Sequence, residues 1–364
     1  MTAGDTAAID LGSSVRAAAD PNPVSDAFLS VRDLYVEFPT EDGVVKAVNG
    51  INLDLERGRT LGIVGESGSG KSVTSQAILG LLKGTSARVT GTISLDGHDL
   101  VRASEAELRK LRGSAMAMIF QDPLSSMHPF YTVGKQITEA YRVHNKATRA
   151  QAKRRTIEML DRVGIPNPDR RYKEYPHQFS GGMRQRAMIA MALVCDPKLL
   201  IADEPTTALD VTVQAQILDL MKDVQKEFNS AIIFITHDLG VVAETCNDVL
   251  VMYGGQCVEM GSIEDIFYRP EMPYTWGLLT SMPRMDRTRQ NRLQPIAGSP
   301  PSLIHVPKGC VFNPRCSYTG HVAGDACFTV HPDLLPTPQG SYARCHIDSS
   351  ERKRIWSTEI APKL

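Results

Sequence analysis

The chain has 364 residues, a length that allows two or three domains. Its apolar content of 42% and charged content of 22% are ordinary for a globular protein. The formal net charge of -1 lacks the basic surplus typical of proteins that bind nucleic acid. The longest apolar run, Ala187 to Cys195, falls far short of the roughly 20 residues that a membrane-spanning helix needs. We therefore expect no nucleic-acid partner and a cytoplasmic protein whose membrane role, if any, requires partner proteins.

The N-terminal part of the chain predicts a tail followed by a small antiparallel sheet. Residues 1–27 are rich in Ala, Asp and Ser and lack the apolar core of a signal peptide, which indicates a disordered tail. Residues 28–37 partly alternate apolar and polar side chains, as in a half-buried strand. The Asp-Gly pair at 42–43 indicates a hairpin turn, and another strand is expected between Gly91 and Leu100.

Short apolar runs separated by helical patterns predict the main core. Buried strands are expected at Thr60–Gly65, Leu199–Ala202 and Ala231–Thr236. Helical spacing follows the first strand, from Ser72 to Leu82, and separates the other two, from Val213 to Phe228. Alternating buried strands and helices indicate an α/β fold with a mainly parallel sheet.

Two further regions depart from the α/β pattern. Residues 123–190 are more polar and mostly helical, which predicts an inserted helical subdomain. From about residue 269 onward the chain is rich in Pro, Gly and Cys, which predicts a C-terminal extension over 269–350. The basic run Arg352 to Arg354 indicates a solvated tail over 351–364. The core domain is thus expected to span residues 28–268.

A glycine-rich segment between the first core strand and its helix fits the P-loop pattern G-x-x-x-x-G-K-[ST]. Glycines let backbone N–H groups close around a phosphate, and the following helix N-terminus favours negative charge. Lys71 is expected to reach the β- and γ-phosphates of ATP, and Ser72 to ligate Mg²⁺. The candidate nucleotide contacts are Gly65, Ser67, Gly68, Ser69, Gly70, Lys71 and Ser72.

Two acids end the second buried strand, in the sequence Leu-Leu-Ile-Ala-Asp203-Glu204-Pro. Asp203 suits a place in the Mg²⁺ shell, and Glu204 suits a base that polarises the attacking water. The alternative, that both acids cap the next helix, is weakened by the P-loop upstream. The sequence therefore predicts an ATP-hydrolysing site that combines these acids with the P-loop.

The segment Phe179-Ser180-Gly181-Gly182-Met-Arg-Gln-Arg resembles the signature sequence of ABC transporters. A Ser-Gly-Gly turn before a helix is itself an anion site. We call Ser180–Gly182 the signature segment. The resemblance implies that these residues cap the γ-phosphate of an ATP bound by a second subunit, so that two chains form a head-to-tail dimer.

Other family markers follow in chain order, and each role is what the resemblance implies. Gln121 resembles the Q-loop glutamine that senses Mg²⁺ and the permease, and Asp210 resembles the D-loop acid. His237 resembles the switch histidine that touches the γ-phosphate. Phe38 occupies the place of the aromatic residue that stacks on adenine, although a strand Phe is often part of a core. The implied catalytic set is Glu204, His237 and Gln121.

Four segments narrow the resemblance to bacterial peptide-importer ATPases of the oligopeptide/dipeptide type. They are 175–186, 206–216, 273–279 and 309–316, within a resemblance that covers about residues 28–350. The form Gly-Gly-Met-Arg resembles the D-type subunit, which pairs with a related F-type ATPase. Implied partners are that ATPase, two transmembrane permease subunits and an extracytoplasmic substrate-binding protein, with this chain at the cytoplasmic face of the membrane. Another cargo such as nickel, or a non-transport role in DNA repair or translation, stays open.

The cysteines form two groups. Cys195, Cys246 and Cys257 lie among apolar residues and predict core positions. The other four crowd into the extension, where their spacing matches neither the close pairs of zinc ribbons nor the ferredoxin patterns. The resemblance implies a structural [4Fe–4S] cluster, which some peptide-importer ATPases carry, while zinc and unligated thiols remain alternatives. The candidate ligands are Cys310, Cys316, Cys327 and Cys345.

Overall fold

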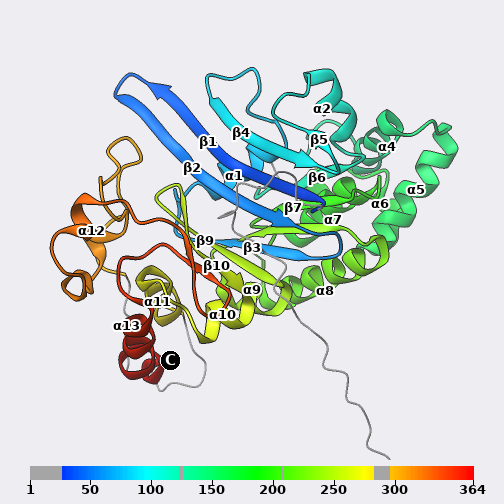
Figure 1. The fold of residues 1–364 in the computed structure, drawn as a ribbon. Helices are drawn as coiled ribbons and strands as arrows, with labels where there is room; N and C mark the ends of the chain where they lie inside the picture. Colours follow the sequence, from blue (N-terminus) through cyan, green and yellow to red (C-terminus); the bar gives the residue numbers. More distant parts are fainter. Residues whose placement is uncertain (1–26, 123–125, 207–208, 283–295) are drawn as a thin grey trace, which may run out of the picture.

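The computed structural model describes residues 27–122, 126–206, 209–282 and 296–364, so the predicted tail over 1–27 lies almost wholly outside it. Its centre is a mixed sheet with the strand order β11-β12-β10-β9-β3-β8-β7-β6 (Figure 1). The run from β9 to β6 is parallel, and the three strands at the other edge pair antiparallel. The strands are β3 Thr60–Val64, β6 Met116–Ile119, β7 Leu199–Asp203, β8 Ala231–Ile235, β9 Asp248–Tyr253, β10 Gln256–Ser262, β11 Leu335–Pro336 and β12 Tyr342–Ala343.

Every residue of β3, β7 and β8 is buried, as their apolar sequences predict for central strands covered on both faces.

The second sheet is antiparallel, with the order β2-β1-β4-β5. Its long hairpin turns at Thr40 and Gly43, where the Asp-Gly pair predicted a turn. Its strands are β1 Leu29–Thr40, β2 Gly43–Leu55, β4 Arg88–Leu95 and β5 His98–Asp99.

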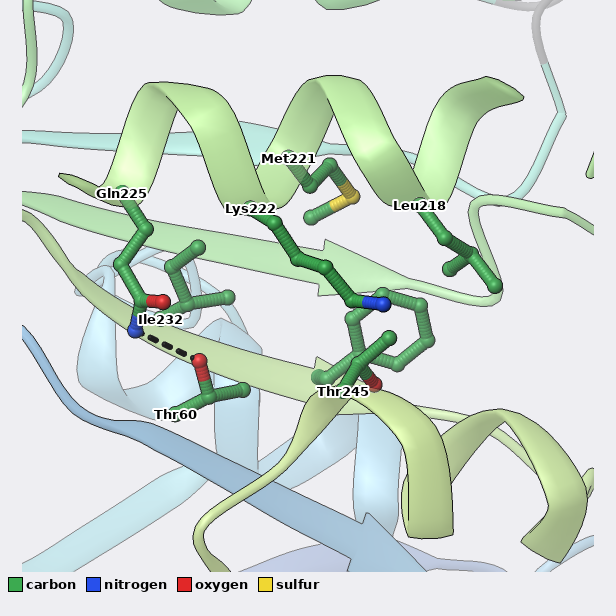
Figure 2. Close-up of a pocket in the computed structure, with 8 residues that line it drawn as sticks. Thr60, Leu218, Met221, Lys222, Gln225, Ile232 and Thr245 are labelled. Atoms are coloured by element: carbon green, nitrogen blue, oxygen red, sulfur yellow. Dashed lines mark hydrogen bonds between the residues drawn. The ribbon is translucent and has the colours of Figure 1, made fainter. Parts of the chain in front are cut away.

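Helices cover the core sheet where the sequence predicts them. The predicted helix after β3, α1 (Lys71–Ile78), ends four residues early, just before Gly80 in a left-handed conformation. Across the sheet, α8 (Val211–Phe228) lies over β8 and points Leu218 and Met221 at the strands (Figure 2). Gln225 Nε2 donates a hydrogen bond to Thr60 Oγ1 over 2.7 Å, which ties α8 to the start of β3. The other core helices are α2 (Glu105–Leu111) and α9 (Leu239–Thr245).

The predicted helical insert is present and lies at the opposite end of the molecule from the C-terminus (Figure 1). It packs as a cluster of helices on the β6 side of the core, where α7 contacts β6. Apolar residues of α7 line its buried face, including Met188 and Ile189. The insert contains α4 Val133–His144, α5 Arg149–Arg162, α6 Pro168–Arg171 and α7 Gly181–Leu193, with a 3₁₀ turn at Pro176–Gln178.

The C-terminal extension is built onto the core instead of standing apart from it. Its strands β12 and β11 continue the core sheet beyond β10. Its aromatic side chains Tyr274 and Trp276, on α11, are almost fully buried. The core ends with helix α10 (Ile263–Tyr268). The helices of the extension are α11 Pro273–Thr280, α12 Ala326–Thr329 and α13 Ser349–Ile355, with 3₁₀ turns at Asn313–Arg315 and Thr319–His321 and further helical turns at Trp356–Ile360 and Ala361–Lys363.

The prediction of a solvated tail over 351–364 is wrong. Helix α13 carries the basic run. The Arg352 side chain is buried, while the Arg354 side chain stays half exposed. Arg352 Nη2 lies 2.8 Å from Glu271 Oε2, and Ile355 is fully buried. Because residues three positions apart share one face of a helix, Arg352 and Ile355 form a buried face on α13. The number of charged residues in the segment does not reveal this face. Across the described parts of the chain, no helix has both the length and the apolar character to span a bilayer.

Candidate nucleotide-binding site

The P-loop joins β3 to α1, and two of its glycines cannot be replaced without collision. Gly65 has φ 150°, and a Cβ there would lie 2.1 Å from the carbonyl oxygen of Met252. Gly70 has φ 102°, and a Cβ there would lie 2.3 Å from the carbonyl oxygen of Ala47. Gly68 also has a positive φ, 76°, but faces open space. Backbone of β2 and β9 therefore presses on the loop and fixes its curled shape.

The interior of this loop is suited to an anion. Lys71 is buried, and its Nζ donates to the carbonyls of Gly65 at 2.7 Å and Glu66 at 2.9 Å. Burial lowers the pKa of Lys71, against the pull of Glu204, Asp203 and Glu66. Ser69 Oγ is buried and has no hydrogen-bond partner among the described residues. A buried ammonium and an unsatisfied hydroxyl in a glycine-curled loop fit a phosphate group.

The two acids at the end of β7 have different environments. Burial raises the pKa of Asp203, while a hydrogen bond from the Ser72 hydroxyl opposes that shift. The side-chain oxygens of Asp203, at the end of β7, and of Ser72, after the P-loop, are the ligand type that Mg²⁺ prefers. Glu204 lies in the left-handed region with φ 47°, and its N–H donates to the carbonyl of Ile235 over 2.8 Å. This unusual backbone turns the Glu204 side chain away from the strand path.

Glu204 lies between two other predicted site residues. Gln121 Nε2 donates to Glu204 Oε2 over 2.9 Å, and His237 Nδ1 lies 3.2 Å from Glu204 Oε1. Glu204 directly follows β7, and Gln121 and His237 lie two positions after the ends of β6 and β8, the two neighbours of β7 in the sheet. Side chains far apart in sequence therefore meet at the carboxyl edge of parallel strands, the usual location of ligand sites in such sheets. The His237 side chain is 65% exposed, so the group opens to solvent on one side.

The signature segment lies against α8 at one end and is exposed at the other. Ser180 caps α7 by accepting a hydrogen bond from the Met183 N–H over 3.3 Å, and both Ser180 and Gly181 are exposed. Gly182 faces Val213 of α8. Asp210 caps α8, accepting from the Val213 N–H over 2.9 Å. The structure thus brings the signature segment next to Asp210, and it leaves the first two residues of the segment open.

Phe38 is the remaining predicted site residue. Phe38 lies on β1 opposite Val45, half buried against the core, on the hairpin whose Ala47 contacts Gly70. Sequence reasoning missed Gln185, which donates to the Pro205 carbonyl over 2.5 Å and links α7 to the segment after Glu204. It also missed the residues of the extension that contact Glu66. These residues are Tyr274 and Arg315, and the only signal for them was their position inside the segments 273–279 and 309–316. Residues 207–208, before Asp210, lie outside the described residues.

The four cysteines of the extension gather in one region of the structure. Cys310 N–H donates to the Cys327 carbonyl over 2.9 Å. Burial raises the pKa of all four thiols, to about 11 for Cys316 and about 12 for Cys345. Within the described ranges, no three His, Cys, Asp or Glu side chains are grouped closely enough to hold a metal ion. The thiols are therefore neighbours, but their sulfur atoms do not outline a formed metal site.

Two families match the sequence: ABC transporter over residues 48–207, and oligopeptide/dipeptide transporter, C-terminal region, over residues 258–322. The oligopeptide transport ATP-binding protein OppD of Bacillus subtilis (strain 168) is 56% identical over 293 residues, covering 80% of this chain and 81% of that protein. The dipeptide transport ATP-binding protein DppD of the same strain is 54% identical over 289 residues, covering 79% and 86%. The corresponding OppD of Escherichia coli (strain K12) is 52% identical over 302 residues, covering 83% and 89%.

Solved structures agree with this assignment. The chain resembles cbiO1 from Clostridium perfringens, part of the ABC transporter complex cbiONQ, with 32% identity and a TM-score of 0.57 over 67% of this chain and 91% of that one. It also resembles a dimeric bacterial ABC transporter cassette, with 25% identity and a TM-score of 0.59 over 65% and 98%. The predicted fold class, a P-loop ABC ATPase core, is confirmed. The chain belongs to the ATP-binding proteins of ABC transporters, in the oligopeptide/dipeptide branch of that family.

Proposed function

We propose that this chain binds and hydrolyses ATP to power the import of oligopeptides or dipeptides through a membrane permease. One observation carries the proposal: Glu204 is held between Gln121 and His237 at the strand end next to Asp203, Ser72 and the P-loop. A carboxylate fixed at both oxygens beside a phosphate cradle is the arrangement that phosphoryl transfer to water requires.

Each predicted site residue has a role in this scheme. The P-loop N–H groups and Lys71 hold the phosphates, and Phe38 stacks on the adenine. Ser72, Asp203 and Gln121 would hold Mg²⁺, which neutralises charge on the phosphates when bound. Glu204 orients and deprotonates the attacking water, and His237 positions Glu204 and the γ-phosphate. We assign these functions to a nucleotide-binding domain over residues 28–268, with its helical subdomain at about 123–190 and the extension at 269–350.

A second ATPase subunit completes the site. Ser180 and Gly181 are exposed at the start of α7, which supports their action on an ATP held by a partner. Their N–H groups at a helix N-terminus suit a γ-phosphate. Asp210 lies beside them and would contact the partner near the same phosphate. We propose an F-type ATPase as that partner, in a head-to-tail heterodimer.

An apolar groove beside the site suits a permease. It has a volume of about 240 Å³ and is lined by the turn after α1, by β6 with its flanking residues, and by α7. Its lining includes Phe120, the residue before Gln121. Phe120, at its edge, is 43% exposed, and Met191 lines it. A short helix from a permease could dock there and sense Gln121 directly, which would place the chain at the cytoplasmic face of the membrane. An extracytoplasmic binding protein would deliver the peptide to the permease.

The peptide cargo is tested by transport in vesicles that contain the assembled permease and binding protein. We expect ATP-dependent uptake of labelled dipeptides or oligopeptides with the wild-type chain and none with Lys71→Ala. ATP-dependent uptake of nickel without any peptide uptake would overturn the assignment of cargo while leaving the ATPase assignment intact.

The cysteines of the extension are proposed separately as the ligands of a structural [4Fe–4S] cluster, on the family resemblance alone. Their sulfur atoms do not outline a metal site as they lie here, so no step of hydrolysis is attributed to them. Anaerobically purified protein should contain about four iron atoms per chain if all four thiolates bind one cluster. Iron-free protein with full ATPase activity would end this proposal.

A further inference from the structure

Arg315, in the C-terminal extension, forms a two-pronged ion pair with the second residue of the P-loop. Its Nη1 lies 2.6 Å from Glu66 Oε2, and its Nη2 lies 3.0 Å from Glu66 Oε1. The two residues are 249 positions apart in sequence. The Arg315 side chain is 3% exposed and the Glu66 side chain 29% exposed, so the arginine is buried while the carboxylate keeps partial access to water. Paired, parallel hydrogen bonds of this kind are among the strongest that proteins make.

The remaining donors of Arg315 are also used. Nη1 donates to Tyr253 Oη over 3.3 Å, Nη2 to the Ile296 carbonyl over 3.0 Å, and Nε to the Ala297 carbonyl over 2.9 Å. A guanidinium has five N–H donors, and these three bonds with the two to Glu66 engage all five. The hydrogen bond with Glu66 also raises the pKa of Arg315. The arginine is therefore fixed in place before any nucleotide arrives.

The extension holds the backbone of Glu66 as well as its side chain. The Glu66 N–H donates to Tyr274 Oη over 2.9 Å. Tyr274 belongs to an aromatic cluster with Tyr253 and Phe312, whose ring centroids are 4.5 to 5.4 Å apart. Phe312 directly precedes the 3₁₀ turn that carries Arg315. Tyr274 therefore binds the backbone N–H of Glu66 while Arg315 binds its carboxylate, and both come from the same packed part of the extension.

Glu66 matters because of where its charge lies. Its carbonyl accepts a hydrogen bond from Lys71 Nζ, and its carboxylate contributes to the electrostatic environment of Lys71. A carboxylate at this position would repel the phosphates of ATP and compete with them for Lys71. The ion pair with Arg315 neutralises the Glu66 carboxylate. This ion pair keeps Lys71 available to the phosphates.

We propose that Arg315 is a positioning residue for ATP, which neutralises Glu66 and holds the P-loop in its phosphate-accepting shape. The C-terminal extension then forms part of the nucleotide site. This inference rests on the proposed ATP binding by the P-loop. Arg315 itself touches no nucleotide, and its effect on ATP passes through Glu66.

The test compares ATP affinity and kinetics across a set of full-length variants. Arg315→Ala should raise both the Kd for ATP of the chain and the KM of the assembled transporter about tenfold, with kcat within about twofold, because affinity and not the chemical step is affected. Adding Glu66→Gln to Arg315→Ala should restore most of the affinity by removing the uncompensated charge. Arg315→Lys keeps the positive charge but loses the two-pronged hydrogen bonding, so its Kd for ATP should lie between those of the wild type and Arg315→Ala.

Arg352→Ala is the matched control, because Arg352 is another buried arginine of the extension paired with an acid, Glu271, away from the P-loop. It should lower the melting temperature and leave the KM for ATP unchanged. The proposal is overturned if Arg315→Ala leaves the Kd unchanged, or if Glu66→Gln restores none of the lost affinity. If Arg315→Ala does not fold, the ATP affinities of Arg315→Lys and the double variant decide in the same way. A wild-type chain that binds no ATP would instead refute the proposed function.

Discussion

Replacement of Glu204 by glutamine tests the centre of the proposed mechanism. The two side chains have the same shape, so the left-handed backbone at this position and the contact with Gln121 can persist. What is lost is the negative charge and the ability to accept a proton from water. A positioned general base contributes roughly 10² to 10⁴ in rate, equivalent to about 3 to 5 kcal/mol of transition-state stabilisation. The Kd for ATP should stay unchanged or fall, since the carboxylate no longer repels the γ-phosphate.

The assay is steady-state ATP hydrolysis by the assembled transporter, with ATP binding measured on the same preparation. Glu244→Gln is the control, because Glu244 is an exposed acid on α9, the helix after His237, and pairs with Lys222. It removes one charge from the same part of the protein and should leave kcat within about twofold. A Glu204→Gln variant that retains more than about a tenth of the wild-type kcat would refute the assignment of Glu204 as the base.

Three other variants or conditions extend the test. The chain without its partner subunit should hydrolyse ATP slowly, and activity should rise on titration with that subunit; full activity in a strictly monomeric sample would contradict the composite site. Gly70→Ala should abolish ATP binding because its Cβ would strike a backbone carbonyl of β2, whereas Gly68→Ala, which faces open space, should bind ATP more tightly than Gly70→Ala does. Burial raises the pKa of Glu259 to about 8, with Arg352 opposing and Glu271 adding to the shift. The folded state therefore binds more protons than the unfolded state between about pH 4.5 and 8, so stability should fall as pH rises through that window, and Glu259→Gln should flatten the dependence in pH-resolved melting curves.

Local patterns were enough to predict most of the core. Uniformly apolar runs identified β3, β7 and β8, because only strands covered on both faces lack polar alternation. The P-loop glycines and the acids after β7 were predicted from motif chemistry. The meeting of Gln121, Glu204 and His237 follows once the strands bearing them are known to be adjacent and parallel.

The structure of the extension could not be predicted from local sequence patterns. Its high Pro, Gly and Cys content predicts only that an extension is present, yet the extension buries Tyr274 and Trp276 and adds strands to the core sheet. Its short elements, such as the two-residue strands β11 and β12, are too brief to show a period. The basic run on α13 misled because charge composition does not reveal which arginine points inward. Only the fold brings Arg352 to its partner on the segment before α11.

Glu66 shows why the core and the extension have to be considered together. An acid in a phosphate-binding loop opposes the function of that loop when it is viewed in the core alone. Residues 28–268 contain Glu66 but neither Arg315 nor Tyr274, which supply the compensating charge and the backbone contact. No motif within the P-loop predicts a partner 249 positions away. On the proposal made above, the nucleotide site is shared between the core, which carries Glu66, and the extension, which supplies the arginine that balances its charge.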